Sequence, residues 1–156
     1  MPAISRPDGV ALPSDRFNLQ RFVEAQAPVL EQVRFELEAG CKVSHWMWFV
    51  FPQIAGLGMS AMSKRYAIGS AEEALAYLAH PVLGARLQEN IEIVNGLEGL
   101  TVYEIFGAPD DAKFHSSMTL FAEVDPQAPA FAQALARYFE GARDHATLRL
   151  LRGGGA

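Results

Sequence analysis

The sequence contains a single cysteine, Cys41, so no disulfide bond can form within the chain. The four histidines and this cysteine lack the C-x-x-C and H-x-x-x-H spacings of zinc ligands, and we expect neither a metal ion nor another cofactor. A formal net charge of -5 leaves no surplus of Lys and Arg for general nucleic-acid binding. These absences favour an enzyme or a binding domain for small molecules or proteins.

Long apolar runs are also missing. Pro52, Gly56 and Gly58 interrupt the most hydrophobic stretch well short of the roughly 20 residues that cross a bilayer. The first residues do not show the charged and apolar regions of a signal peptide. We therefore expect a cytoplasmic protein with no membrane segment. Its 156 residues, 50% of them hydrophobic, suffice for the core of one domain.

Helical signals dominate the chain. Apolar residues recur at helical spacing between capping residues and Gly or Pro stops, which predicts a mainly α, compact, multi-helix domain over residues 16–152. Unpatterned Pro and Gly predict a flexible lead-in at residues 1–15, and the terminal glycines predict a flexible tail at residues 153–156. The expected helices begin near Asn18, Pro28, Ser70, Pro81, Thr101, Asp110, Asp125 and Asp144.

Two segments have the aromatic or β-branched enrichment of strands. These are residues 46–51 and, less clearly, residues 118–124. A short strand pair between them is therefore the alternative to helix throughout.

The densest aromatic stretch is SHWMWFVFPQ, residues 44–53, which contains both tryptophans. Fully burying a large apolar side chain contributes roughly 1.5 to 3 kcal/mol, so a core role alone would explain the aromatics. It explains His45 and Gln53 less well. We therefore expect a pocket wall here, with Trp46, Trp48 and Gln53 as ligand contacts and His45 as a catalytic acid or base. A histidine hydrogen-bonded at the edge of a core is the structural alternative.

A glycine-rich turn follows this stretch. Its sequence GLGMSA, residues 56–61, has the form G-x-G-x-x-A, in which glycines let a backbone approach a phosphate. A complete dinucleotide fold needs further parallel strands, which the helical pattern does not supply. A smaller anion site and a tight turn with solvated cations both remain open. The candidate ligand contacts are Gly56, Gly58, Ser60, Lys64 and Arg65.

A second polar cluster, DDAKFHSS, occupies residues 110–117. In a helix, Asp111 and His115 share a face at i and i+4, so the carboxylate can orient the imidazole. Lys113 and Ser117 form the same spacing on another face. This predicts Lys113 and Asp111 as catalytic candidates and His115 and Ser117 as ligand contacts. The alternative is helix capping by the aspartates, with the other side chains on the surface.

Several longer strings carry a family resemblance over residues 18–151. They are LQRFVEAQ (19–26), SHWMWFVFPQ (44–53), GLG (56–58), YLAHPVLG (77–84) and SSMTLF (116–121). The chain resembles an uncharacterised bacterial and fungal family known as a domain of unknown function, to which the label calpastatin is sometimes attached. The resemblance implies no particular reaction. A calpastatin-type inhibitor is a repetitive disordered chain, whereas this sequence is apolar, aromatic and without repeats.

A fainter similarity involves Lys113-Phe114, Leu120, Leu135 and Gly141. It is a similarity to small N-glycosidases that act on ADP-ribose and related ribose phosphates, although no motif here marks their acidic residue. It implies a nucleotide-like or sugar-phosphate ligand and hydrolysis of an N-glycosidic bond. A non-enzymatic interaction module and a small-molecule sensor are the alternatives. Substrate identity and oligomeric state are left open.

Overall fold

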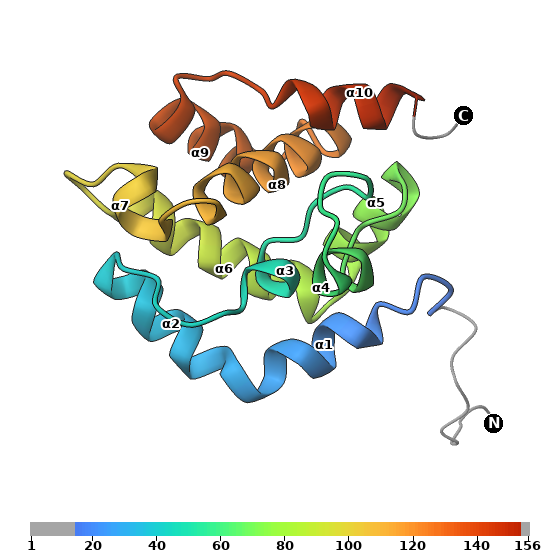
Figure 1. The fold of residues 1–156 in the computed structure, drawn as a ribbon, viewed down its shortest axis with the longest axis horizontal. Coiled ribbons are helices and arrows are strands. Elements are labelled where there is room, and N and C mark those ends of the chain that lie inside the picture. The colour runs from blue at the N-terminus through green and yellow to red at the C-terminus, as the bar shows by residue number, and fades with distance from the viewer. Residues whose placement is uncertain (1–14, 154–156) are drawn as a thin grey trace.

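The computed structural model describes residues 15–153 (Figure 1). The predicted lead-in and tail lie outside the described residues, except for Asp15 and for Gly153, which ends the last helix. The elements are α1 (Gln20–Gln26), the 3-10 turn η1 (Ala27–Val29), α2 (Leu30–Ala39), α3 (Met47–Val50), α4 (Ala61–Arg65), α5 (Ala71–Ala79), α6 (Leu83–Gly96), α7 (Val102–Phe106), α8 (Asp110–Val124), α9 (Pro129–Phe139) and α10 (His145–Gly153). The predicted mainly helical fold is confirmed.

The alternative strand pair is wrong. Residues 46–51 contain the single-turn helix α3, and residues 118–124 belong to α8. Every residue from 116 to 122 is buried, so this part of α8 has no exposed face, and its sequence lacks the alternation of apolar and charged residues that marks a surface helix. Among the described residues, extended pairing is limited to one bridge between Ile54 and Ile68.

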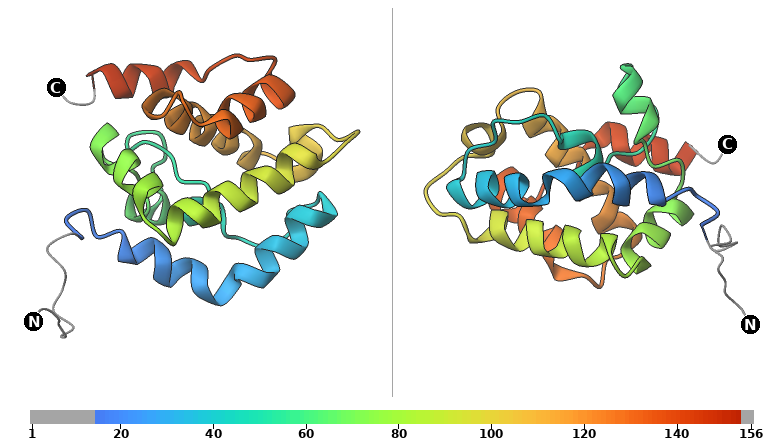
Figure 2. Two further views of the ribbon diagram at one scale, coloured as in Figure 1. Left: turned by 180° about the vertical axis from the view of Figure 1, so that it is seen from behind. Right: turned by 90° about the horizontal axis from the view of Figure 1, so that it is seen from below.

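The long helices α6 and α8 organise the domain. Helix α8 packs against α5, α7, α9 and α10, and α6 packs against α2, α5 and α9. Helices α1 and α2 run along α6 at one edge of the molecule, and α9 and α10 lie at the opposite edge (Figures 1 and 2). None of the helices within residues 15–153 has the length and apolar character needed to cross a bilayer.

Aromatic side chains fill the centre of the core. Phe114 of α8 is fully buried, and its ring lies 5.1 Å from that of Phe51 in an edge-on arrangement and 4.7 Å from that of Phe106 in a stacked one. Such pairs stabilise a core beyond the area that they bury. The aromatic stretch at residues 44–53 is thus joined to α7 and α8.

Helix ends follow the predicted signals at most positions. Gly40 ends α2 with φ +69°, and Thr101 forms the predicted capping box with Glu104. Two predicted starts are wrong. Asn18 does not cap α1, because the carboxylate of Asp15 accepts from the N–H of Leu19 at 2.6 Å instead. The other is the start of the helix predicted near Asp125, since α9 begins four residues later, at Pro129.

Candidate functional site

The carboxylate of Glu36 fixes the loop that leads into α3. It accepts hydrogen bonds from the backbone N–H groups of Val43 at 2.8 Å and Ser44 at 3.0 Å. The indole Nε1 of Trp46 donates another at 3.0 Å, and the Ser44 hydroxyl and the Gln32 amide each donate at 2.6 Å. Burial raises the pKa of Glu36, but these donors outweigh it and lower the pKa to about 2. Glu36 is therefore a buried anion at neutral pH.

The two tryptophans of this segment have different surroundings. Trp46 is fully buried, and its N–H is used by Glu36. Trp48 is only partly buried, and the carbonyl that follows it, on Phe49, accepts from the side-chain Nε2 of Gln26 at 2.7 Å. Hydrogen bonds therefore fix helix α3 at Trp46, just before its first residue, and at Phe49, near its end. Of the two tryptophans, Trp48 is the one that lines a cavity.

That cavity has a volume of about 140 Å³, and we call it the Trp48 cavity. It is lined by Trp48, Gln53, Ile54, Ala55, Gly56, Gly58, Ser63, Lys64, Tyr66 and Ala67. Five of the predicted ligand contacts are therefore brought together: Trp48, Gln53, Gly56, Gly58 and Lys64.

The glycines of the predicted turn shape this cavity. Gly56 has φ +106°, a conformation that other residues rarely adopt. A Cβ on Gly58 would lie 2.4 Å from the hydroxyl of Ser63, so only glycine permits that approach. Ser60 is exposed and caps the short helix α4 by accepting from the N–H of Ser63 at 3.1 Å. The glycines therefore permit close packing in this turn, and the side chains of Lys64 and Arg65 after it are exposed.

Arg21 of α1 supports the far side of the same loop. Its guanidinium donates to the backbone carbonyls of Arg65 and Ala67, each at 2.8 Å, and pairs with the carboxylate of Glu73 at 3.1 Å. Two more of its hydrogen bonds go to carbonyls at the start of α1. Arginine suits this role because its rigid fork can satisfy several acceptors at once. The end of α4 is thereby tied to α1 and α5.

A charged cluster lies against the rings of both tryptophans, and we call it the lysine cluster: Lys42, Asp110 and Lys113. The ammonium of Lys42 lies 2.8 Å from the Asp110 carboxylate, donates to the Ser44 carbonyl and lies 4.9 Å from the ring centre of Trp46. The ammonium of Lys113 is 3.6 Å from Asp110 and 5.3 Å from the ring centre of Trp48. The one carboxylate is thus shared by two cations, the nearer of which is almost fully buried.

Other predicted site residues lie away from the Trp48 cavity lining. His45 is exposed, with no side-chain hydrogen bond to another described residue. Arg65 is exposed and lies 5.5 Å from the ring centre of Tyr66. Asp111 accepts from the N–H of Ala112 at 2.8 Å in the first turn of α8, whose N-cap position is Pro109, so neither aspartate caps this helix.

His115 and Ser117 have structural surroundings. The imidazole of His115 stacks on Phe139 at 4.0 Å, and its Nε2 lies 2.8 Å from the carbonyl of Ala142, so it does not pair with Asp111. Ser117 is fully buried, and its hydroxyl has no hydrogen-bond partner among the described residues. Within residues 15–153, no three His, Cys, Asp or Glu side chains gather in an arrangement that could hold a metal ion.

Sequence reasoning missed Lys42 and Asp110 as members of a site. They are 68 positions apart, and no local spacing links them. A usable signal exists nonetheless, since the sequence has only three lysines, and all three are at this site. Lys64 lines the Trp48 cavity, and the other two contact the tryptophan rings.

The arrangement is that of a small helical domain with a small cavity that is lined in part by a tryptophan and a lysine and has two further lysines beside the tryptophan rings. Comparison with known proteins defines it further. Residues 16–151 match the family described as "Protein of unknown function (DUF1810)". The chain belongs to this family, which confirms the predicted resemblance to a domain of unknown function.

A solved structure is also similar to this chain. The chain is similar to the conserved hypothetical protein Rv1873 from Mycobacterium tuberculosis, with 52% sequence identity and a TM-score of 0.86. The similarity covers 90% of this chain and 99% of that one. No curated protein has a matching sequence. Neither the family description nor the solved relative names a glycosidase, so the fainter predicted similarity gains no support.

Proposed function

We propose that the protein binds a small anionic metabolite, of the nucleotide-like or sugar-phosphate class, at Trp48. One observation carries the proposal: the three lysines of the sequence are all placed around the two tryptophans, and one of them lines the Trp48 cavity. The other ten basic residues of the chain are arginines. A partly buried aromatic ring beside cations suits a ligand that has both a flat or sugar-like part and a negative charge.

The charge balance favours an anion. Asp110 is the carboxylate of the lysine cluster, and it lies closer to Lys42 than to Lys113, at 2.8 Å against 3.6 Å. Lys113 therefore keeps donor capacity for a ligand, because an ammonium group has three N–H donors. Lys64 adds a positive charge at the cavity itself, where no Asp or Glu occurs among the described lining residues.

The size of the cavity limits what enters it. At about 140 Å³ it is smaller than the roughly 300 to 1,000 Å³ of typical ligand pockets, so it fits one ring or one sugar. A neighbouring hollow of about 360 Å³, which reaches α5 and α10, shares the lining residues Ile54, Ala55 and Gly56. A ligand with two parts would place one in each.

Binding has better support than hydrolysis. Hydrolysis of an N-glycosidic bond needs a carboxylate next to the sugar and an activated water. No Asp or Glu is among the described lining residues of the Trp48 cavity, and Asp110 pairs with Lys42 and Lys113. Glu72 lines the neighbouring hollow without a motif that marks it as catalytic. N-glycosidic hydrolysis is therefore a reaction to assay once a ligand is found.

The interaction-module hypothesis rests on exposed apolar side chains. The most exposed are Met59, Val43, Phe35 and Tyr103, which lie on four different segments. Exposed apolar residues are common on protein surfaces, so their presence alone does not favour an interaction surface over the ligand site.

The test is a thermal-shift titration with ADP-ribose, NAD, ribose 5-phosphate and inorganic phosphate. A ligand at 100 times its dissociation constant stabilises the fold by about 2.7 kcal/mol. We expect at least one organic phosphate to stabilise the protein, and Lys113→Ala and Lys64→Ala each to weaken that ligand by about tenfold or more, because each removes a charge-assisted contact. Arg152→Ala, at an exposed position near the end of α10, is the matched control.

Two results would contradict the proposal. One is the absence of any shift across the panel in a folded protein. The other is a ligand whose affinity is unchanged in both lysine variants.

A further inference from the structure

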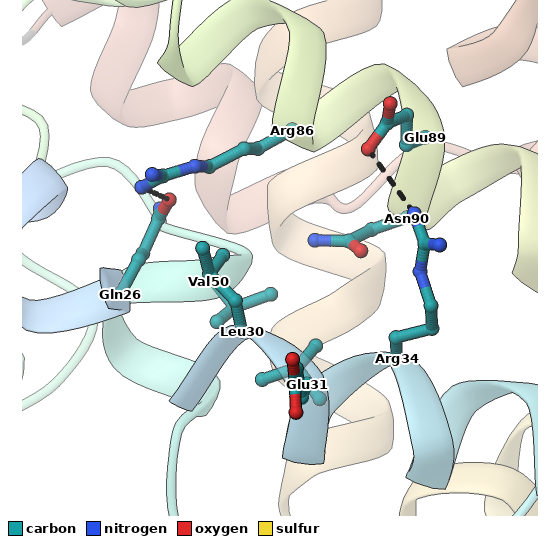
Figure 3. Close-up of a pocket in the computed structure, with 9 residues that line it drawn as sticks. Gln26, Leu30, Glu31, Arg34, Val50, Arg86, Glu89 and Asn90 are labelled. Atoms are coloured by element: carbon teal, nitrogen blue, oxygen red, sulfur yellow. Dashed lines mark hydrogen bonds and ion pairs between the residues drawn. The ribbon is translucent and has the colours of Figure 1, made fainter. Parts of the chain in front are cut away.

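A second cavity lies between α1, α2 and α6, with a volume of about 230 Å³ (Figure 3). We call it the Arg86 cavity. Its lining residues are Gln26, Leu30, Glu31, Val33, Arg34, Val50, Arg86, Glu89 and Asn90, none of which belongs to the predicted site. Arg86 and Glu89 lie opposite the apolar stripe of α6, where the sequence predicts a solvent-exposed helix face. In the structure they line a cavity next to α1 and α2.

A buried amide sets the polar end of the Arg86 cavity. Gln26 is only 3% exposed, and its Nε2 donates to the Phe49 carbonyl at 2.7 Å and to the Tyr77 hydroxyl at 3.1 Å. Both N–H bonds of the amide are thereby used, so the oxygen Oε1 faces Arg86 and accepts from its Nη1 at 3.2 Å. The orientation of the guanidinium is fixed by a neutral, buried partner.

Arg86 carries a charge that this partner does not neutralise. Within the described chain, no carboxylate lies within 4 Å of its guanidinium, and its one side-chain hydrogen bond is to Gln26. Arg21, the other partly buried arginine described above, has Glu73 and four carbonyls as partners. Glu89 on the rim of the cavity pairs with Arg34 at 3.5 Å instead. Arg86 therefore has N–H donors without a partner among the described residues, and the two oxygens of a carboxylate match the arginine fork.

The opposite wall of the cavity is apolar. Leu30, Val33 and Val50 face the space between the helices, and Val33 and Val50 are almost fully buried. Glu31 on the rim disfavours a ligand of high negative charge. A singly charged ligand with a short hydrocarbon part meets these conditions.

We propose that the Arg86 cavity binds a small organic acid, whose carboxylate pairs with Arg86 and whose apolar body packs on Leu30, Val33 and Val50. This site is separate from the Trp48 cavity, and the proposal stands whether or not an anionic metabolite binds there.

The test is an NMR titration of ¹⁵N-labelled full-length protein with sodium hexanoate as the probe. We expect saturable shifts at amides of α2 and α6 around the cavity, and none with hexanamide, which has the same chain without the charge. Inorganic phosphate serves as an anion without an apolar body, and we expect it to leave these amides unshifted.

Two variants locate the site. Arg86→Gln removes the charge, and Leu30→Asp adds a repelling carboxylate at the partly exposed first residue of α2, where an acidic side chain suits the helix dipole. Each should weaken hexanoate binding by about tenfold or more, while Leu30→Asn, of the same shape as the aspartate, should weaken it less. The inference is overturned if hexanoate gives no saturable shifts, if hexanamide or phosphate binds equally well, or if the folded Leu30→Asp variant binds like the original protein.

Discussion

Glu36→Gln is expected to destabilise the protein because it removes a buried charge that five donors stabilise. Glu36 is 2% exposed, and its pKa is lowered from 4.5 to about 2. At 1.36 kcal/mol per pKa unit, the charged form contributes about 3 kcal/mol to the free energy of unfolding at pH 7. The amide of glutamine keeps the volume of the side chain but accepts with one oxygen only. We expect the variant to lose about 3 kcal/mol.

The pH dependence provides a second measure. Because the pKa of Glu36 is lower in the folded state than in the unfolded state, its stabilisation is complete above about pH 4.5 and is lost as the pH falls toward 2. The glutamine variant has no such group. The difference in stability between the two proteins should therefore shrink to less than half of its neutral value by about pH 3.

Urea denaturation at several pH values measures both effects, with the midpoint and the slope fitted separately. Glu38→Gln, at an exposed position on the same helix, is the control and should change stability by less than about 0.5 kcal/mol. A loss below about 1 kcal/mol in Glu36→Gln at pH 7 would refute the reasoning, since exposed carboxylates cost no more than that. A difference that stays constant down to pH 3 would refute it as well.

Two further substitutions test the packing of the helices. A Cβ on Gly84 would lie 2.2 Å from the backbone carbonyl oxygen of Leu78, so Gly84→Ala should separate α5 from α6 and cost about 3 kcal/mol in urea denaturation. Gly96→Ala, with open space around it in the same helix, should leave stability equal or higher, and similar losses in both would contradict the steric argument. Ser117→Ala should raise the melting temperature or leave it unchanged, because the buried hydroxyl has no partner among the described residues. A loss above about 1 kcal/mol would instead reveal a hydrogen bond to Ser117.

Much of the helical layout could be predicted because its signals are local. The Thr101 capping box and the Gly40 stop each depend on residues within one turn of helix. The apolar stripe of α6, which includes Leu87 and Ile91, requires only one amphipathic face. Helix α8 showed no clear helical periodicity of apolar residues in the sequence, because residues 116–122 are all buried.

The candidate site could be predicted only in part, for a similar reason. Trp48 and Gly56 line the same cavity and lie close in sequence, so a local motif found both. The lysine cluster depends on a contact between α8 and the loop after α2, which no spacing encodes. Gln26 follows Phe22 at i+4, so both lie on the buried face of α1. A glutamine on a buried helix face needs hydrogen-bond partners, and this could have indicated the polar contacts that Gln26 makes in the core.

Helix α3 separates the two cavities by a single turn. Trp48 lines one cavity and Val50, two residues later, lines the other. The carbonyl of the residue between them is held by Gln26, the same side chain that orients Arg86. Any ligand that displaces this turn moves a wall of both cavities, and thermodynamic linkage then requires that each ligand alter the affinity for the other by the same factor. If a ligand in the Arg86 cavity displaces this turn, the fluorescence of the Trp48 indole would report the displacement, although Trp48 does not line that cavity.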